Sequence, residues 1–138
     1  GPLLVIGITV NILGVVLCIH EEPWLLNQIP NEVLLETSFS ILFSQKTNIG
    51  LPLFLTTIYR FLGLWLLTTG SIIICYVYVT RLGTKVARDS IFLVLSVTLV
   101  AIYYLTFSYF PSSPLLPILH FFAICLVSSI FCSKYLPD

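Results

Sequence analysis

The hydrophobic residues of the chain are concentrated in four long stretches, over about residues 3–19, 52–79, 90–110 and 114–132. A helix needs roughly 20 largely apolar residues to cross a bilayer, and none of the four stretches has the polar face of a soluble helix. The ten-residue alternation typical of a membrane barrel is absent. The pattern predicts an all-α fold, an integral membrane four-helix bundle that forms one domain over residues 1–138.

The only long connection, residues 20–50, carries a second helical pattern. After Pro30, polar residues recur every four positions while apolar residues fill the remaining arc, and Asn31 is a suitable N-cap. We therefore expect an amphipathic helix from Asn31 within a capping loop. Because the polar repeat holds no basic residue, a lid over the bundle end is favoured over a helix bound to anionic lipid. The repeat consists of Glu32, Glu36, Ser40 and Ser44.

Composition agrees with a membrane protein. Hydrophobic residues make up 58% of the chain and charged residues 9%, whereas a soluble domain carries about 25% charge. Six basic residues balance six acidic ones, so there is no excess of positive charge to neutralise phosphates of a nucleic acid. The expected partners are membrane lipids, other membrane proteins and further copies of this chain.

The distribution of Lys and Arg predicts the orientation. With four spans, both termini and the loop 81–89 share one side of the membrane, and the opposite side has Lys46 as its loop cation. Basic residues in short loops resist translocation. Both termini and the loop 81–89 are therefore expected on the cytosolic or equivalent side. The basic residues on that side are Arg81, Lys85, Arg88 and Lys134.

Arg60 lies near the outer boundary of the second span, counted back about 20 residues from its end. In one interpretation its side chain reaches the lipid headgroups as an interfacial anchor. In the other it turns inward and forms an ion pair, because a charge among apolar residues is costly unless paired. Such a pair would hold the capping loop in place. The acidic partners available on this side are Glu21, Glu22, Glu32 and Glu36.

Small residues form stripes on the first two spans. Gly7, Asn11 and Gly14 share one helix face, and Gly63 and Gly70 stand seven residues apart. Small residues let membrane helices approach closely, so these two spans are expected to pack through the stripes. Asn11 lies near the middle of its span and needs a hydrogen-bond partner there. Candidate partners are the hydroxyls of Thr68, Thr69 and Ser71.

Two histidines lie in the acidic half of the molecule, His20 at the end of the first span and His120 inside the fourth. Histidines on separate spans can ligate haem, but these differ in depth by about 9 Å at about 1.5 Å per residue. We therefore expect no cofactor and no metal. His120 is expected to bond a neighbour or line a cavity, with Tyr103, Tyr104 and Tyr109 within reach.

Catalytic motifs are absent from the sequence. There is no H-E-x-x-H, G-x-S-x-G or glycine-rich phosphate loop, and the spans contain no Asp or Glu. Transporters driven by protons usually carry carboxylates inside the membrane. The sequence therefore favours a protein without catalytic residues.

The run Arg60-Phe61-Leu62-Gly63-Leu64-Trp65-Leu66-Leu67-Thr68-Thr69 resembles the second span of two kinds of small four-helix membrane family. One is the ergosterol-biosynthesis scaffold family of the endoplasmic reticulum, with its Arg-x-x-Gly-x-Trp segment. The other is the bacterial DoxX-like group with related uncharacterised families. The order of one span, a long loop and three close spans also agrees over about residues 5–130. The resemblance implies a non-catalytic scaffold or lipid-associated protein.

Three functions follow as hypotheses. The first is a bundle with a capped, mostly apolar cavity that binds a lipid-like molecule or holds partner membrane proteins. The second is a structural subunit of a larger membrane complex. The third is an intramembrane enzyme that acts on a lipid through His20, Glu21, Glu22, Arg60 and His120. The polar ligand contacts predicted for the first are Arg60, His120, Asn11 and Tyr104.

Overall fold

The chain is described from a computed structural model over residues 1–81, 83–109 and 111–136, the side chain of Tyr109 excepted. Every secondary structure element in this part is a helix, which confirms the predicted all-α class. Four of the helices are long and apolar enough to cross a membrane. In chain order the elements are α1 (Pro2–Ile19), the 3-10 helix η1 (Pro23–Asn27), α2 (Gln28–Leu35), α3 (Phe39–Ser44), the 3-10 helix η2 (Lys46–Asn48), α4 (Leu51–Thr80), α5 (Lys85–Tyr109) and α6 (Leu116–Ser133).

The helix that contains the predicted third span is longer than that span. The span is predicted over 90–110, and α5 begins at Lys85, five residues before residue 90. Lys and Arg are good helix formers, so the helix continues through them beyond the apolar stretch. Thr84 caps the N-terminus of α5, because its Oγ1 accepts a hydrogen bond from the Ala87 backbone N–H at 3.4 Å. Residue 110, the expected end of this span, lies outside the described residues.

The continuous loop helix predicted from Asn31 is wrong, because the segment forms two short helices. α2 begins at Gln28 and accommodates Pro30 in its first turn, where the missing N–H is not needed. It ends at Leu35, because the backbone of the following Glu36 is left-handed at φ 55°. Ser38 then caps α3 by accepting from the Ile41 N–H at 3.4 Å. The regular polar repeat therefore runs across a helix break.

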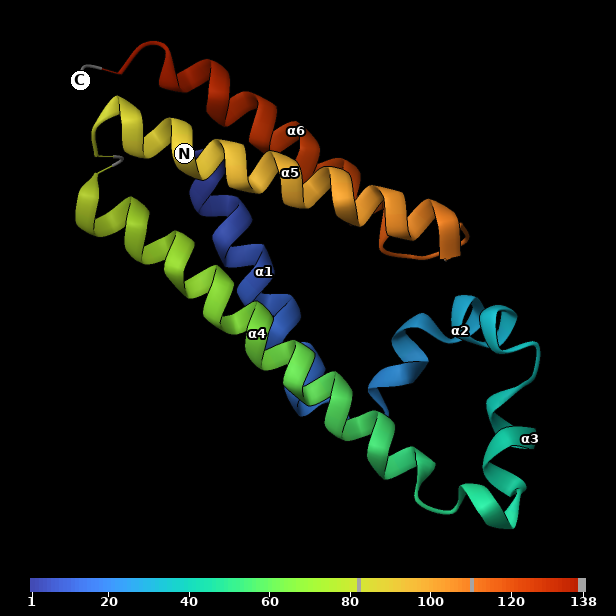
Figure 1. Ribbon diagram of the computed structural model, residues 1–138. Coiled ribbons are helices and arrows are strands. Elements are labelled where there is room, and N and C mark those ends of the chain that lie inside the picture. Colours follow the sequence, from blue (N-terminus) through green and yellow to red (C-terminus); the bar gives the residue numbers. More distant parts are fainter. Residues whose placement is uncertain (82, 110, 137–138) are drawn as a thin grey trace.

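α1 packs along α4 through the glycine stripes, as the sequence predicted, and Figure 1 shows the two helices crossing. A Cβ on Gly14 would lie 2.7 Å from the backbone O of Gly63, and one on Gly70 would lie 2.7 Å from the backbone O of Gly7. Any larger side chain at these positions would collide with the facing backbone. The two helices therefore touch through backbone atoms.

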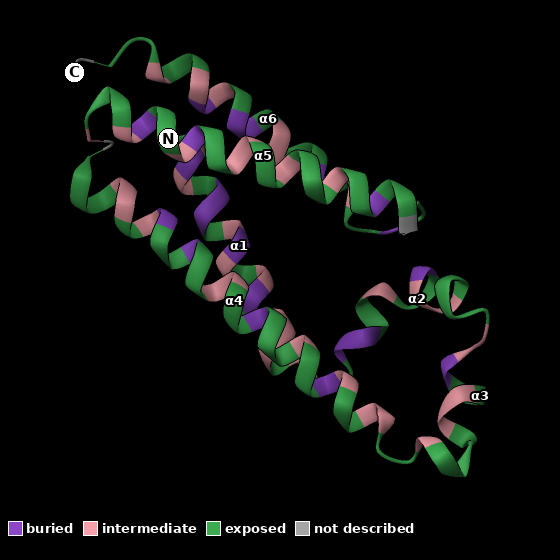
Figure 2. Cartoon of the chain, viewed as in Figure 1, coloured by how far each residue is buried: buried purple, intermediate pink, exposed green. Residues whose placement is uncertain are grey.

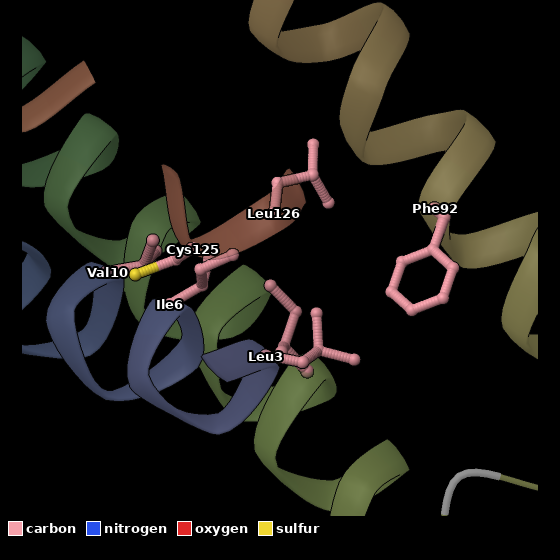
Figure 3. Packing of buried hydrophobic residues seen from close by; sticks show 7 residues of the cluster. Leu3, Ile6, Val10, Phe92, Cys125 and Leu126 are labelled. Carbon is pink, nitrogen blue, oxygen red and sulfur yellow. The ribbon is translucent and has the colours of Figure 1, made fainter. Parts of the chain in front are cut away.

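The buried core lies where the four long helices meet, toward the N-terminal end of α1. α6 packs along α5 and also contacts α1. Figure 3 shows Ile6 and Val10 of α1 beside Cys125 of α6. Elsewhere the long helices expose large apolar side chains over most of their length (Figure 2). The cluster consists of Leu3, Ile6, Val10, Ile73, Phe92, Cys125 and Leu126.

The ends of the molecule differ in what they carry. The N-terminus, the α4–α5 turn and the end of α6 lie toward one end, and the loop with α2 and α3 lies at the other (Figure 1). This arrangement follows from an even number of long helices joined in alternating directions. It places the basic residues of the α4–α5 turn and of the α6 end together.

Candidate functional site: an apolar cavity beneath the capping loop

A cavity of about 560 Å³ lies where α1, α4, the capping loop and the α5–α6 connection meet. Ten of its fifteen lining residues are apolar, and five are polar but uncharged. The apolar wall is contributed by Leu13, Val16, Leu17, Leu26, Ile58, Leu62, Leu66, Pro114, Leu115 and Ile118.

The polar lining residues connect the loop to the helices around it. The Asn31 side-chain amide donates to the Tyr59 hydroxyl at 2.9 Å and to the Trp24 backbone O at 3.4 Å. The Ser113 hydroxyl donates to Asn27 Oδ1 at 3.1 Å. These bonds join the loop to α4 on one side and to the α5–α6 connection on the other. Thr106 completes the polar lining.

An aromatic cluster keeps the capping loop folded above the cavity. The buried Trp24 ring meets Phe43 edge to face at 5.6 Å between centroids, and Phe43 stacks on Phe39 at 5.4 Å. Aromatic pairs at such distances are worth about 0.5–1.5 kcal/mol beyond the area they bury. Trp24 is thus a core residue of the loop.

Arg60 lies outside this cavity, and its side chain is exposed on α4. Its backbone O accepts a hydrogen bond from the Cys18 thiol at 3.7 Å. Within the described residues, the structure does not bring its guanidinium into an ion pair with Glu21, Glu22 or Glu36. Glu32 has other partners, because its Oε1 accepts from the Phe39 N–H at 2.9 Å. The neighbouring Tyr59 holds the loop instead.

Two other predicted site residues have the partners expected of them. The Tyr103 hydroxyl and His120 Nδ1 are 2.7 Å apart, which confirms a tyrosine of α5 as the partner of His120. The Ser71 hydroxyl donates to Asn11 Oδ1 at 3.4 Å, which confirms one of the predicted partners of Asn11. Tyr104 is exposed.

None of the four predicted ligand contacts, Arg60, His120, Asn11 and Tyr104, lines the cavity. Their contact with a ligand stays a prediction, separate from this cavity. Among the residues considered for an enzyme, His20 Nδ1 accepts from the backbone N–H of Glu22 at 3.0 Å. The described residues contain no group of three His, Cys, Asp or Glu side chains placed to hold a metal ion.

Sequence reasoning missed the amides and hydroxyls that line the cavity. Asn31 was interpreted as a helix cap, although it lies inside α2 and reaches across to α4. One signal was available for Tyr59, which precedes Gly63 by four residues and therefore shares the helix face that turns toward α1. No comparable signal marks Asn27 or Ser113, because their pairing depends on how the loops fold.

Comparison of the chain with protein families, with curated proteins and with solved structures finds no match. The resemblance of the second span to the ergosterol-biosynthesis scaffold and DoxX-like families therefore stays a prediction. Function has to be argued from the cavity itself.

Proposed function

We propose that this chain is a multi-pass membrane protein that binds a neutral, lipid-like molecule in the cavity beneath its capping loop. The single observation that carries the proposal is the largely apolar space of about 560 Å³ beneath the loop, with a few uncharged polar groups in its lining. Ligand sites typically measure about 300–1,000 Å³ and combine an apolar wall with a few polar groups. The cavity fits that description in both size and lining.

The lining indicates the chemical class of the ligand. The described residues around the cavity include no acidic, basic or histidine side chain. An ionised headgroup would lose its hydration there without gaining an opposite charge, which is costly. Amide and hydroxyl groups can donate to or accept from a ligand hydroxyl or carbonyl. The proposed ligand is therefore apolar with one uncharged polar end, such as a sterol, an isoprenoid alcohol or a diacylglycerol.

Membrane insertion of the four long helices is part of the proposal. It is supported by their length and by the large apolar side chains exposed on all of them. Exposing such a surface to water costs free energy, whereas exposing it to lipid chains does not. The basic turn and tail support a cytosolic placement of that end. The cavity would then lie near the opposite interface, where a molecule with one polar end is best accommodated.

A pair of matched variants of the full chain tests the cavity. Leu62 lines it and is 48% exposed, while Leu64 is 56% exposed on the same helix and does not line it. Leu62→Trp should fill the space and reduce the neutral lipid that copurifies in mild detergent about tenfold, and Leu64→Trp should leave that neutral lipid unchanged. Native mass spectrometry gives the occupancy, and extraction of the bound material gives its class.

Three results would contradict the proposal. The wild-type chain could carry no neutral lipid after purification and show no uptake of added cholesterol or diacylglycerol. The copurifying lipid could be anionic throughout. Finally, Leu62→Trp and Leu64→Trp could reduce occupancy equally, which would indicate a general effect of added bulk on α4.

A second candidate function is a structural subunit of a membrane complex. It is favoured by an open apolar groove of about 680 Å³ along one face of α4, lined by residues that include Leu67, Ile72 and Val79. A helix of a partner protein could pack there. Native mass spectrometry separates the two functions, since a stable heteromer without bound lipid supports the subunit and contradicts the lipid-binding proposal.

A further inference from the structure

The end of the molecule opposite the cavity holds a basic pocket of about 550 Å³ between the start of α5 and the end of α6. Lys85, Arg88 and Lys134 line it together with Asp89, so the described lining has two more positive than negative charges. The Lys134 ammonium lies 5.1 Å from the centre of the Phe131 ring, within the range of a cation–π contact. The pocket is therefore suited to an anion.

Arg88 is buried and places a positive charge in the wall of this pocket. Only 3% of the residue is exposed. Its Nε donates to the Ser133 hydroxyl at 3.2 Å, and a terminal guanidinium nitrogen donates to the Gly83 backbone O at 2.9 Å. These bonds tie α5 to the end of α6 and to the α4–α5 turn. A charge held in a wall of low dielectric raises the potential in the adjoining space.

A smaller, apolar pocket of about 240 Å³ adjoins the basic one. Arg88, Phe92, Ser133 and Leu136 line both pockets, so the two share a wall. Beyond that wall the smaller pocket is lined mainly by apolar side chains of α1 and α4, among them Leu3 and Val77. A basic space next to an apolar one matches a molecule with a phosphate at one end and a hydrocarbon chain at the other.

We infer that this end of the molecule binds the phosphate of an anionic phospholipid, with Lys85 and Lys134 contacting the phosphate and an acyl chain entering the apolar pocket beside Phe92. The inference rests on the membrane insertion proposed above and not on the neutral ligand of the other cavity. Lysine binds phosphate as a compact point charge. Phosphatidylcholine has a compensating choline cation and should bind more weakly, and inorganic phosphate lacks the chain.

The test compares two double variants that change the net charge equally. Lys85→Gln with Lys134→Gln removes both lysines of the pocket, and both side chains are exposed. Lys46→Gln with Arg81→Gln removes two cations that do not line it. Native mass spectrometry of the full chain, titrated with phosphatidylglycerol, phosphatidylcholine or inorganic phosphate, gives the affinities. We expect the first double variant to bind phosphatidylglycerol more weakly, by about fivefold for each lysine removed. The second double variant should bind it with the affinity of the wild-type chain.

Several outcomes would overturn the inference. Phosphatidylglycerol and phosphatidylcholine could bind equally to the wild-type chain. Alternatively, the two double variants could lose affinity equally, which would indicate that binding depends on the net charge of the chain and not on this pocket. Inorganic phosphate binding as tightly as phosphatidylglycerol would show that no lipid chain is recognised. Leu62→Trp should leave phosphatidylglycerol binding intact, so failure of this site and failure of the neutral-lipid cavity are distinguishable.

Discussion

Single residues decide how closely α1 and α4 approach. At Gly14, Gly63 and Gly70, a Cβ on one helix would fall on a backbone oxygen of the other, within 2.8 Å. Backbone atoms cannot move aside as the end of a flexible side chain can. Asn11 lies in the same stripe and has its amide oxygen bonded to Ser71. The helix pair thus combines close backbone packing with one polar link.

Gly14→Ala tests this packing. Its Cβ would lie 2.7 Å from the Gly63 backbone O, and overpacking of this kind costs about 1–3 kcal/mol. We expect the free energy of unfolding, measured by denaturant titration in mixed micelles, to fall by that amount. Gly50→Ala is the matched control, since nothing lies within 4 Å of its added Cβ. Equal stability of Gly14→Ala and wild type would show that the helices are farther apart.

Among the elements, the capping loop is joined to its neighbours by neutral hydrogen bonds and is folded by aromatic packing and by the Glu32 carboxylate, which accepts from the Phe39 N–H. Asn31 of α2 bonds Tyr59 of α4, and Trp24, Phe39 and Phe43 form a small core within the loop. The Tyr59 hydroxyl thus joins the loop to α4, in addition to the packing of η1 on α4. Because a neutral bond of this kind contributes about 1 kcal/mol, the lid can open locally without unfolding the long helices.

Tyr59→Phe removes that hydroxyl and keeps the ring. Loss of about 1 kcal/mol should make amide hydrogens of residues 28–35 exchange about fivefold faster in hydrogen-exchange mass spectrometry. Tyr78→Phe, an exposed tyrosine farther along α4, is the control and should change nothing there. Arg60→Ala should also leave the exchange unchanged. If Arg60→Ala accelerates it and Tyr59→Phe does not, an ion pair of Arg60 holds the loop instead.

At the scale of the whole molecule, the two ends are chemically different. One end carries the loop and a cavity lined by uncharged residues, and the other carries a basic pocket around the buried Arg88. In the proposed membrane placement, the neutral site lies at the outer interface and the basic site at the cytosolic one. The core of α1, α4, α5 and α6 side chains lies toward the basic end.

Cysteine labelling tests this placement. Thr47→Cys lies in the loop and Thr84→Cys in the α4–α5 turn, and both threonines are exposed. In a chain whose four native cysteines are replaced by alanine, a membrane-impermeant maleimide should label Thr47→Cys in intact cells. It should label Thr84→Cys only after permeabilisation. Labelling of both variants from the same side would contradict a membrane-spanning α4.

The hydrophobic pattern was sufficient to predict the long helices and the contact between α1 and α4. Runs of about 20 apolar residues and glycines at helical spacing depend on local sequence and on one helix face, so they can be read without the fold. α5 extends beyond the predicted apolar stretch, because Lys85 and Arg88 continue the helix. The pattern failed in the loop, where Glu36 takes a left-handed backbone that ends α2.

Local sequence is therefore enough to predict the helical class, the four long apolar helices and the grouping of basic residues at one end. Which polar groups meet at a site depends on the fold. Asn27 and Ser113 are 86 positions apart, and Asn31 and Tyr59 are 28 apart. Such pairs carry no periodic signal, because hydrogen bonds between loops depend on where each chain segment ends in space rather than on spacing along it.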